Sequence, residues 1–457
     1  MIYFLATVAA IAGFLFGYDE GVIAVAGPLL EADFPMNPVM RGFMTAAVPL
    51  GALAAAFAAG PLADRFGRRR VLMAAAALFT VGALVAGAIT AIWMLVAARL
   101  ALGLAIGVAA VAAPLYIAES SPEERRGGLV SAYQLAITLG ILGSYLTGLA
   151  IGGAHAWRLM FALGAVPAVL FLAGLAALPE SPRWLALQGR AAAARDSLRR
   201  LRPAGWNVDA EIDAVIATAK AETERATGYR ALLSPTVRPA LVVAVALFFL
   251  QQLSGINAVI YYAPEIFSHA GFDGAQTRIL ATAGIGAVNC ITTVLAVVLI
   301  DRLGRRRLLV LGFAGAAASM LLIAAAVTFP ALVPSGAVIV LLLLYIASFA
   351  ISIGPLPHVM MSEIFPLRAR GPGMSAASIS NWGFNFLVVF AFPVLLAGPG
   401  LAFTFSLFAA ICLAGVLFTR LRVPETTGLS LEVIEAHLAS GRPLATLGRD
   451  PVQRVRT

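Results

Sequence analysis

Three ionisable side chains interrupt long apolar stretches of this sequence. Asp19 and Glu20 lie in the stretch 2–30, and Arg99 lies near the start of the stretch 93–118. A charge inside an apolar medium costs at least ~2.5 kcal/mol, so an ion pair between Asp19 and Arg99 would offset the cost of both. Protonation of Asp19 would free Arg99 and change how the two stretches pack, whereas a permanent pair would be purely structural. Glu20 points ~100° away from Asp19 on a helix, and its role stays open.

Amides form a second polar set inside the apolar stretches. They are Gln134, Gln251, Gln252, Asn257, Asn289 and Asn381, the last beside Trp382. Gln and Asn are uncharged side chains that both donate and accept hydrogen bonds, as a ligand rich in hydroxyl groups requires. An aromatic face can cover the apolar face of a ring. Alternatively, such amides join helices to one another, at ~0.6 to 2 kcal/mol each. Gly255 would let its helix unwind locally and turn side chains toward a cavity.

Composition decides which elements must position these residues. The chain is 61% hydrophobic and 12% charged, and its mean hydropathy is +0.92. A water-soluble domain carries about 25% charged residues, so lipid must be the solvent here. Stretches of about 20 apolar residues cross the ~30 Å hydrocarbon layer as helices. We predict twelve such helices, at 2–30, 40–62, 71–91, 93–118, 128–151, 157–178, 238–268, 277–300, 308–329, 334–362, 371–396 and 400–421.

The sequence repeats itself once. The arginine-rich turn 64–69 recurs 237 positions later as 301–306, and Glu119 with Arg126 recurs 244 positions later as Glu363 with Arg370. Pro179-Glu180 recurs 245 positions later as Pro424-Glu425. A near-constant offset indicates two equivalent helical bundles with a site between them. We therefore predict bundles at 1–180 and 237–423, a cytoplasmic helical linker at 181–236 and a cytoplasmic tail at 424–457. Within the linker, 182–201 and 209–226 have polar helical patterns.

The distribution of charge excludes several classes of protein. Arginines gather in the loops after even-numbered helices, which places those loops and both termini in the cytoplasm. The net charge of +9 is then explained by topology and contact with the lipid bilayer, not by nucleic acid. No phosphate-binding G-x-x-x-x-G-K-[ST] loop occurs and Lys220 is the only lysine, which argues against an ATP-driven pump. Cys290 and Cys412 lie in apolar segments, so we expect neither a disulfide nor a metal site, and no cofactor. The first helix lacks a basic start and contains Asp19, which favours a retained helix over a cleaved signal peptide.

Six motifs in order carry a family resemblance. They are the segments 13–19 (GFLFGYD), 60–65 (GPLADR), 119–127, 179–184 (PESPRW), 251–257 (QQLSGIN) and 424–428 (PETTG). In these motifs the chain resembles the sugar porters of the major facilitator superfamily, which include bacterial proton-sugar symporters and animal glucose facilitators. The resemblance covers nearly the whole chain. It implies an all-α membrane protein with two six-helix bundles that is not an enzyme. It further implies a monomer in the cell membrane, which in a bacterium would be the inner membrane.

The resemblance also implies a function. We expect a secondary active transporter that imports a monosaccharide with protons by alternating access. A passive facilitator or a polyol or inositol symporter is the alternative, and the sequence does not identify the sugar. Asp19 and Arg99 match the proton-coupling pair of the family, in which passive members carry a neutral residue at the position of Asp19. Gln251, Gln252 and Asn257 match its sugar-contacting motif. His358 stands where many glucose and xylose porters place a stacking tryptophan, so it is either a substrate contact or a neutral pocket residue.

The charged motifs at the helix ends predict a cytoplasmic gate. Ion pairs there would hold the bundles closed on the inside and bias a two-state equilibrium, whereas the alternative role is to anchor the topology. The predicted gate residues are Asp64, Arg65, Arg68, Arg69, Glu119, Arg126, Glu180, Arg183, Asp301, Arg302, Arg305, Arg306, Glu363, Arg370 and Glu425.

Overall fold

The computed structural model separates into two compact units, Met1–Glu224 and Arg225–Thr457. It describes residues 1–151, 153, 155–203, 206–213, 229–272, 274–331, 333–366, 369–429, 431–440 and 442–448. The predicted linker 181–236 is divided between the two units. The limits predicted for the two bundles and for the tail, 1–180, 237–423 and 424–457, remain a prediction.

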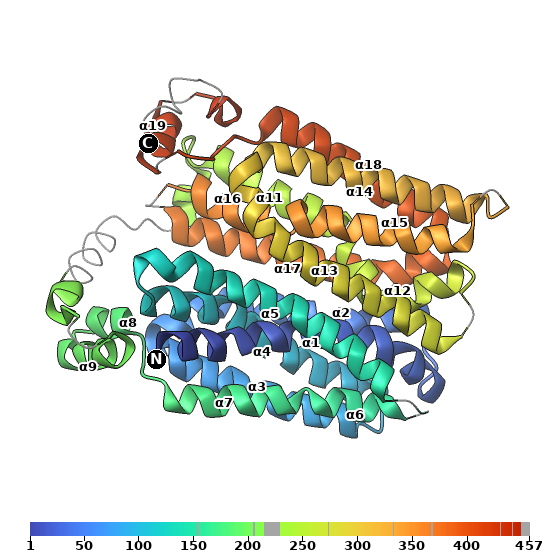
Figure 1. Ribbon diagram of the computed structural model, residues 1–457, viewed down its shortest axis with the longest axis horizontal. Helices are drawn as coiled ribbons and strands as arrows, with labels where there is room; N and C mark the ends of the chain where they lie inside the picture. Colours follow the sequence, from blue (N-terminus) through green and yellow to red (C-terminus); the bar gives the residue numbers. More distant parts are fainter. Residues whose placement is uncertain are drawn as a thin grey trace. The chain divides into compact units, whose positions relative to one another are not determined.

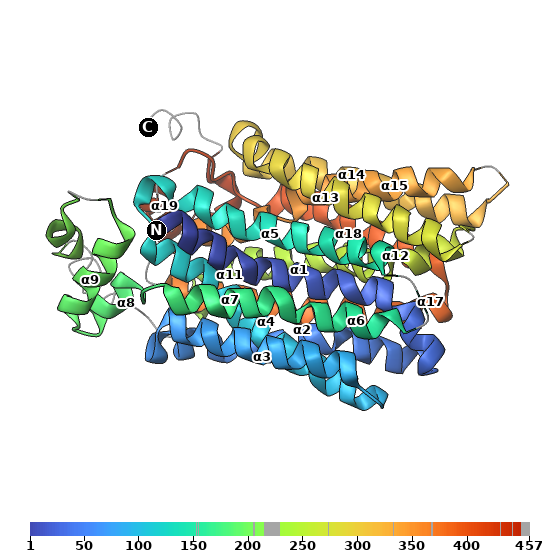
Figure 2. The same cartoon turned by 60° about the horizontal axis from the view of Figure 1, so that its bottom comes forward.

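The first unit is a bundle of long helices with two short helices at one end (Figures 1 and 2). Its helices are α1 (Ile2–Asp33), α2 (Pro38–Phe66), α3 (Arg68–Ala88), α4 (Ile92–Ser120), α5 (Glu123–Ala150), α6 (Ala156–Leu163), α7 (Ala165–Ala177), α8 (Pro182–Leu187) and α9 (Ala191–Leu201). Helix α1 packs along α5, and α4 packs against both α2 and α3. The N-terminus lies at the same end of this unit as α8 and α9.

The second unit is a bundle in which α14 packs along α18 and α15, and α11 packs along α17. Its elements are η1 (Tyr229–Leu233), α11 (Arg238–Leu253), α12 (Ile256–His269), α13 (Ala275–Leu303), α14 (Arg305–Thr328), α15 (Ser335–Ser348), η2 (Phe349–Ile353), α16 (Leu356–Ile364), α17 (Arg370–Ala397), α18 (Leu401–Arg422), α19 (Leu431–Ala439) and η4 (Leu444–Thr446). The part of this unit that the structure describes contains helices and turns without strands.

The prediction of twelve membrane helices is confirmed. Among the described residues, twelve helical spans are long and apolar enough to cross a membrane. Large apolar side chains on the outer faces are exposed, among them Phe57 at 61%, Val81 at 58% and Leu322 at 54%. In water such a surface would be unfavourable, but lipid covers it without cost. This explains why the composition is so apolar.

Three of the spans are discontinuous. The sixth is broken at Gly164 between α6 and α7, and the seventh at Ser254-Gly255 between α11 and α12. The tenth passes from α15 through the π-turn η2 to α16. The break in the seventh span was expected from Gly255. The sixth and tenth spans were expected to be continuous, because hydropathy alone does not reveal a break.

Helices α1 and α5 approach each other closely just before Asp19 in the chain. A Cβ atom at Gly17 would lie 1.8 Å from the carbonyl oxygen of Ile137, so only glycine fits at this crossing. Small residues of this kind let two membrane helices approach backbone to backbone. Asp19 and Glu20 follow directly and are buried, at 2% and 5% exposure.

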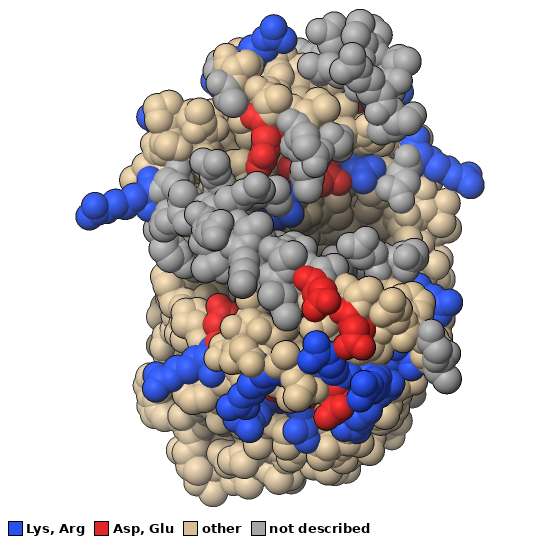
Figure 3. Space-filling model, turned by 90° about the vertical axis from the view of Figure 1, so that its left-hand side faces the viewer, with Lys and Arg blue, Asp and Glu red and all other residues tan. Residues whose placement is uncertain are grey.

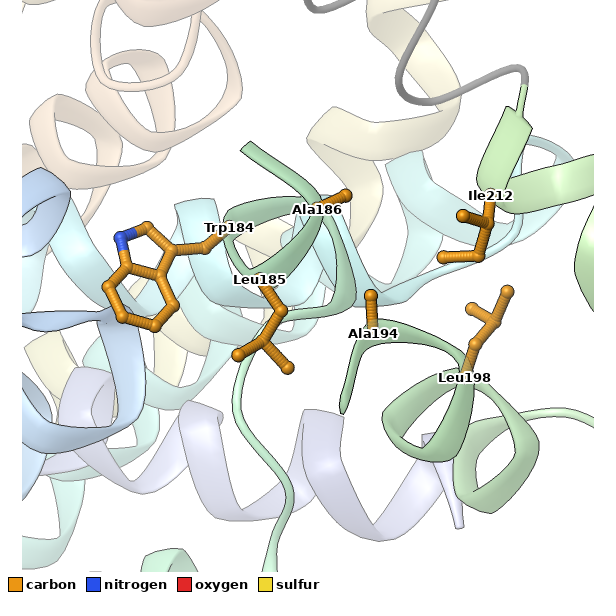
Figure 4. Packing of buried hydrophobic residues seen from close by; sticks show 6 residues of the cluster. All are labelled: Trp184, Leu185, Ala186, Ala194, Leu198 and Ile212. Carbon is orange, nitrogen blue, oxygen red and sulfur yellow. The ribbon is translucent and has the colours of Figure 1, made fainter. Parts of the chain in front are cut away.

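The polar segment after the first six spans folds into short helices. Its predicted helix 182–201 is two helices, α8 and α9, separated by a turn around Gly189. A small cluster of buried residues holds them together, and Figure 4 shows Leu198 of α9 facing Ile212 across it. The second predicted helix, 209–226, is described only as far as Asp213, where it is helical, and its remainder lies outside the described residues.

Candidate functional site

The first unit brings Asp19 and Arg99 together inside the bundle. Nη1 of Arg99 lies 3.8 Å from Oδ1 of Asp19. Arg99 is 0% exposed, and within the described part of the chain neither its Nη1 nor the Oδ2 atom of Asp19 has a hydrogen-bond partner. The pairing is therefore incomplete: one carboxylate oxygen is at the limit of an ion pair, and the other is unbonded.

A proline explains why Arg99 stays in place. Pro49 in α2 has no N–H for the carbonyl of Thr45, and its ring pushes that carbonyl out of the helical ladder. Nη2 of Arg99 donates to the oxygen of Thr45 at 3.2 Å, and Nε donates to the oxygen of Met44 at 3.1 Å. These two hydrogen bonds anchor the guanidinium to α2 without a contribution from Asp19.

The second unit joins four of the predicted amides into a network. Nδ2 of Asn257 donates to Oε1 of Gln252 at 2.6 Å, and Nε2 of Gln252 donates to Oδ1 of Asn381 at 2.5 Å. Gln251 donates to the carbonyls of Ile353 and Gly354, each at 2.8 Å. The Ile353 oxygen is free because residue 357, four positions later, is a proline.

The break between α11 and α12 lies among these amides. Gly255 has φ of +95°, in the left-handed region that side chains with Cβ atoms avoid. The Tyr345 hydroxyl donates at 3.0 Å to the carbonyl of Ser254, which the break leaves without a helical partner. Gln251 and Gln252 end one helix and Asn257 begins the next, so the two sides of the break contribute to one polar network.

The other predicted substrate residues are placed at different depths. His358 is exposed; its Nδ1 lies 3.4 Å from the Gly354 oxygen and its ring meets the Phe248 ring edge-on, with centroids 4.9 Å apart. It therefore shares the Gly354 carbonyl with Gln251. Trp382 and Asn289 are buried on α17 and α13, and Gln134 is exposed on α5 of the first unit.

Asn385 was missed by the sequence analysis. It lies one helical turn after Asn381 on α17, is 2% exposed, and its Oδ1 has no hydrogen-bond partner in the described part of the chain. The spacing of four residues after Asn381 was the available signal, since it places both amides on one helix face.

A charged network ties the helix ends of the first unit. Nη2 of the buried Arg68 lies 2.8 Å from Oε1 of Glu119 and 3.1 Å from Oδ1 of Asp64. The other oxygen of Glu119 accepts a hydrogen bond from the Ser181 hydroxyl at 2.6 Å. This joins the start of α3, the end of α4 and the chain after α7. Figure 3, which looks onto that end of the helices, shows arginine side chains gathered around a few carboxylates.

Glu180 completes this network. It accepts a hydrogen bond from the backbone N–H of Arg69 at 2.9 Å, so its charge lies at the N-terminus of α3, where it is favourable. The Arg69 guanidinium donates to the carbonyls of Leu175 and Ala176 at the end of α7.

The second unit repeats the main bonds of this arrangement. Arg305 lies 3.3 Å from Glu363, and the other oxygen of Glu363 accepts from the Thr426 hydroxyl at 2.5 Å. Glu425 accepts from the backbone N–H groups of Arg305 and Arg306, at 3.0 and 3.2 Å. The repeat seen in the sequence therefore extends to individual hydrogen bonds.

Other predicted gate residues lie at the same helix ends. Arg65 and Arg302 are exposed, and Arg183 is half-buried in α8. Arg370 is half-buried at the start of α17, and its Nε and Nη2 have no hydrogen-bond partner in the described part of the chain. The side chains of Arg126 and Asp301 lie outside the described residues.

Comparisons with known proteins match this geometry to one family. The profile of the family described as "Sugar (and other) transporter" matches residues 5–438. The galactose-proton symporter of Escherichia coli is 37% identical over 450 residues, which cover 98% of this chain and 97% of the relative. The arabinose-proton symporter of Bacillus subtilis is 38% identical over 438 residues, 93% of each chain. The D-xylose transporter of Levilactobacillus brevis is 37% identical over 433 residues, 94% of each chain.

Solved structures of the same family are also similar to this chain. The inward-open xylose transporter XylE of Escherichia coli is 30% identical, with a TM-score of 0.82 over 95% of this chain and 99% of that one. XylE bound to 6-bromo-6-deoxy-D-glucose is 32% identical, with a TM-score of 0.78 over 95% and 98%. The chain has twelve membrane spans, and its relatives match it over nearly its whole length. It therefore belongs to the sugar porter family of the major facilitator superfamily, whose members are multi-pass membrane transporters and not enzymes.

Proposed function

We propose that this protein imports a monosaccharide together with protons by alternating access, as a monomer in the cell membrane. The arginine-rich turns support a cytoplasmic location of both termini. The observation that carries the proposal is the incomplete pairing of Asp19 with Arg99. The relatives named as sugar-proton symporters support the same class of transport.

The geometry of the pair suits a group that gains and loses a proton. A buried ion pair that served structure alone would need good geometry and additional hydrogen bonds to offset desolvation. Asp19 instead has one oxygen 3.8 Å from Arg99 and one without a hydrogen-bond partner among the described residues. Because Arg99 keeps its bonds to two carbonyls of α2, protonation of Asp19 changes the charge of the site without dismantling it.

The amide network supplies the proposed sugar contacts. Each amide of Asn257, Gln252 and Asn381 bonds another amide, and a sugar hydroxyl, which both donates and accepts, can replace such a partner on equal terms. We include His358, Trp382, Asn289 and, from the first unit, Gln134 as further proposed contacts. Polyols and inositol carry the same hydroxyl chemistry, so the substrate panel must contain them.

The test is uptake into proteoliposomes of a panel of labelled sugars and polyols, with and without an imposed pH gradient. Asp19→Asn keeps the volume of the side chain and removes its titration. We expect counterflow exchange to continue and accumulation driven by the gradient to be lost, because sugar movement is then no longer linked to protons.

Glu20→Gln is the matched control, since Glu20 is the adjacent buried carboxylate. It should keep both exchange and accumulation. Accumulation by Asp19→Asn would contradict the assignment, and its loss in Glu20→Gln alone would transfer the role to Glu20. A wild-type protein that never accumulates sugar would be a passive facilitator.

A further inference from the structure

A cavity of about 620 Å³ lies at the end of α14 and α18 in the second unit, within the range of small-molecule sites. Its lining residues are Arg306, Arg307, Val310, Leu311, Arg420, Glu425 and Gly448. The predicted gate uses Arg306 and Glu425. Nothing in sugar transport uses Arg307, Arg420 or the apolar wall.

The charge of this cavity favours an anion. Three arginines and one glutamate line it, and the carboxylate of that glutamate accepts hydrogen bonds from the backbone of Arg305 and Arg306 and from the Thr427 hydroxyl. Arg307 and Arg420 are exposed. An arginine fork binds phosphate oxygens bidentately in a fixed geometry, so a phosphate group fits this chemistry better than a halide.

The apolar side of the cavity selects the source of that phosphate. Val310 and Leu311 lie one turn further into α14 than Arg306 and Arg307, and Leu311 is 60% exposed. Because α14 is a membrane span beginning at Arg305, the cavity crosses from the headgroup layer to the start of the hydrocarbon. Basic cavities of this kind between membrane helices bind anionic lipid headgroups.

The internal repeat shows that this cavity is not simply part of the shared gate. Arg307 corresponds to Arg70 at the offset of 237, but Arg420 corresponds to Ala176 at the offset of 244. In the first unit Nη2 of Arg69 donates to the carbonyl of Ala176, as Nη2 of Arg306 donates to the carbonyl of Arg420. The backbone role is therefore common to both units, and the second unit adds a positive side chain.

We propose that this cavity binds an anionic phospholipid, with its phosphate between Arg307 and Arg420 and an acyl chain along Val310 and Leu311. The site does not depend on the proposed transport function; only its assignment to the cytoplasmic leaflet rests on the proposed orientation. Because Arg306 and Glu425 form one wall, the bound headgroup lies directly beside the charged network of the second unit.

Binding can be tested on the full purified chain by native mass spectrometry with phosphatidylglycerol, and with phosphatidylcholine as the zwitterionic comparison. The variant is Arg307→Gln/Arg420→Gln. The control is Arg70→Gln/Arg422→Gln, which removes equal charge at the repeat counterpart of Arg307 and at an exposed residue of α18 outside the cavity. We expect affinity for phosphatidylglycerol to fall roughly tenfold to thirtyfold in the variant and to be unchanged in the control.

Two further measurements separate the sources of phosphate. Leu311→Ser should weaken phosphatidylglycerol binding, and inorganic phosphate at millimolar concentration should not displace the lipid. Equal losses in variant and control would mean that only overall charge matters and would overturn the site. Displacement by inorganic phosphate, or equal binding of phosphatidylcholine, would overturn the assignment to an anionic lipid. Melting temperatures of both double variants identify any loss that results from unfolding.

Discussion

Among the described residues, three polar side chains bind carbonyl oxygens that a proline has released from a helix. Arg99 binds Thr45, four residues before Pro49, and Gln251 binds Ile353, four residues before Pro357. The Tyr262 hydroxyl likewise donates at 3.2 Å to Val389, four residues before Pro393. In lipid an unpaired carbonyl costs several kcal/mol, so each release requires a donor from another helix. The prolines thereby fix where functional side chains are held.

Gln252 is the central amide of the network, and its removal tests the substrate site. Gln252→Ala should weaken sugar binding by roughly 1 to 3 kcal/mol, because a buried hydroxyl and two amides would lose a partner. Equilibrium binding to the purified protein measures this loss. Ser319→Ala serves for comparison, since Ser319 is a buried polar residue on α14 that is not among the proposed contacts. A folded Gln252→Ala protein with unchanged sugar affinity would contradict the site.

His358 provides a test of specificity. His358→Trp would give a larger aromatic face at the position beside Phe248 and Gly354, and we expect preference to shift toward pyranoses of the glucose or xylose type. The ranking of a substrate panel by competition checks this. If the ranking stays as in the wild type, the side chain at position 358 does not contact the substrate.

Breaks in two membrane spans determine how the amide side chains and the backbone carbonyls of the site are oriented. A helix running through Gly255 would turn Asn257 by ~200° relative to Gly255 and keep its backbone groups satisfied along the ladder. The left-handed Gly255 instead ends α11 and starts α12 in a new direction. The π-turn η2 and Pro357 do the same in the tenth span, which exposes the carbonyls that Gln251 binds.

The break at Gly255 can be tested by adding one methyl group. In Gly255→Ala, the Cβ atom would lie 2.4 Å from Cδ2 of Phe408, and φ of +95° would be strained for alanine. We expect a loss of roughly 1 to 3 kcal/mol in stability and impaired sugar binding. Gly284→Ala is the control, because nothing lies within 4 Å of its added Cβ. Equal melting temperatures of the two variants would show that the break tolerates a side chain.

Internal duplication gives the whole molecule two copies of one charged network. In each copy an arginine at a helix start meets a glutamate whose second oxygen accepts from a hydroxyl, Ser181 in one unit and Thr426 in the other. Equivalent networks in two units can bias one conformational equilibrium in the same direction, as alternating access requires.

Neutralising equivalent carboxylates tests this symmetry. Glu119→Gln would leave the buried Arg68 without its charged partner, and we expect faster hydrogen exchange at the start of α3 together with slower transport. Glu363→Gln should do the same at the start of α14, with a smaller effect because its distance to Arg305 is 3.3 Å instead of 2.8 Å. Unchanged exchange and transport in both variants would support the simpler role of these residues as topology anchors.

The sequence by itself determined the membrane class, the twelve spans, the duplication and the break at Gly255. Each of these depends on local information, because hydropathy is summed along one segment and a glycine marks its own conformational freedom. The motif around Gln251, Gln252 and Asn257 also led correctly to the family, which the comparisons confirm.

Only the tertiary structure decided which atoms meet. The partners of Arg99 lie about 55 positions away in the chain on α2, and Asn381 reaches Gln252 across 129 positions. Such contacts depend on how each helix rotates and how deeply it sits against its neighbours, which the hydropathy of the separate segments does not encode. For the same reason the sequence does not reveal the cavity beside Arg307 and Arg420, or the oxygens of Asp19 and Asn385 that lack a hydrogen-bond partner in the described part of the chain.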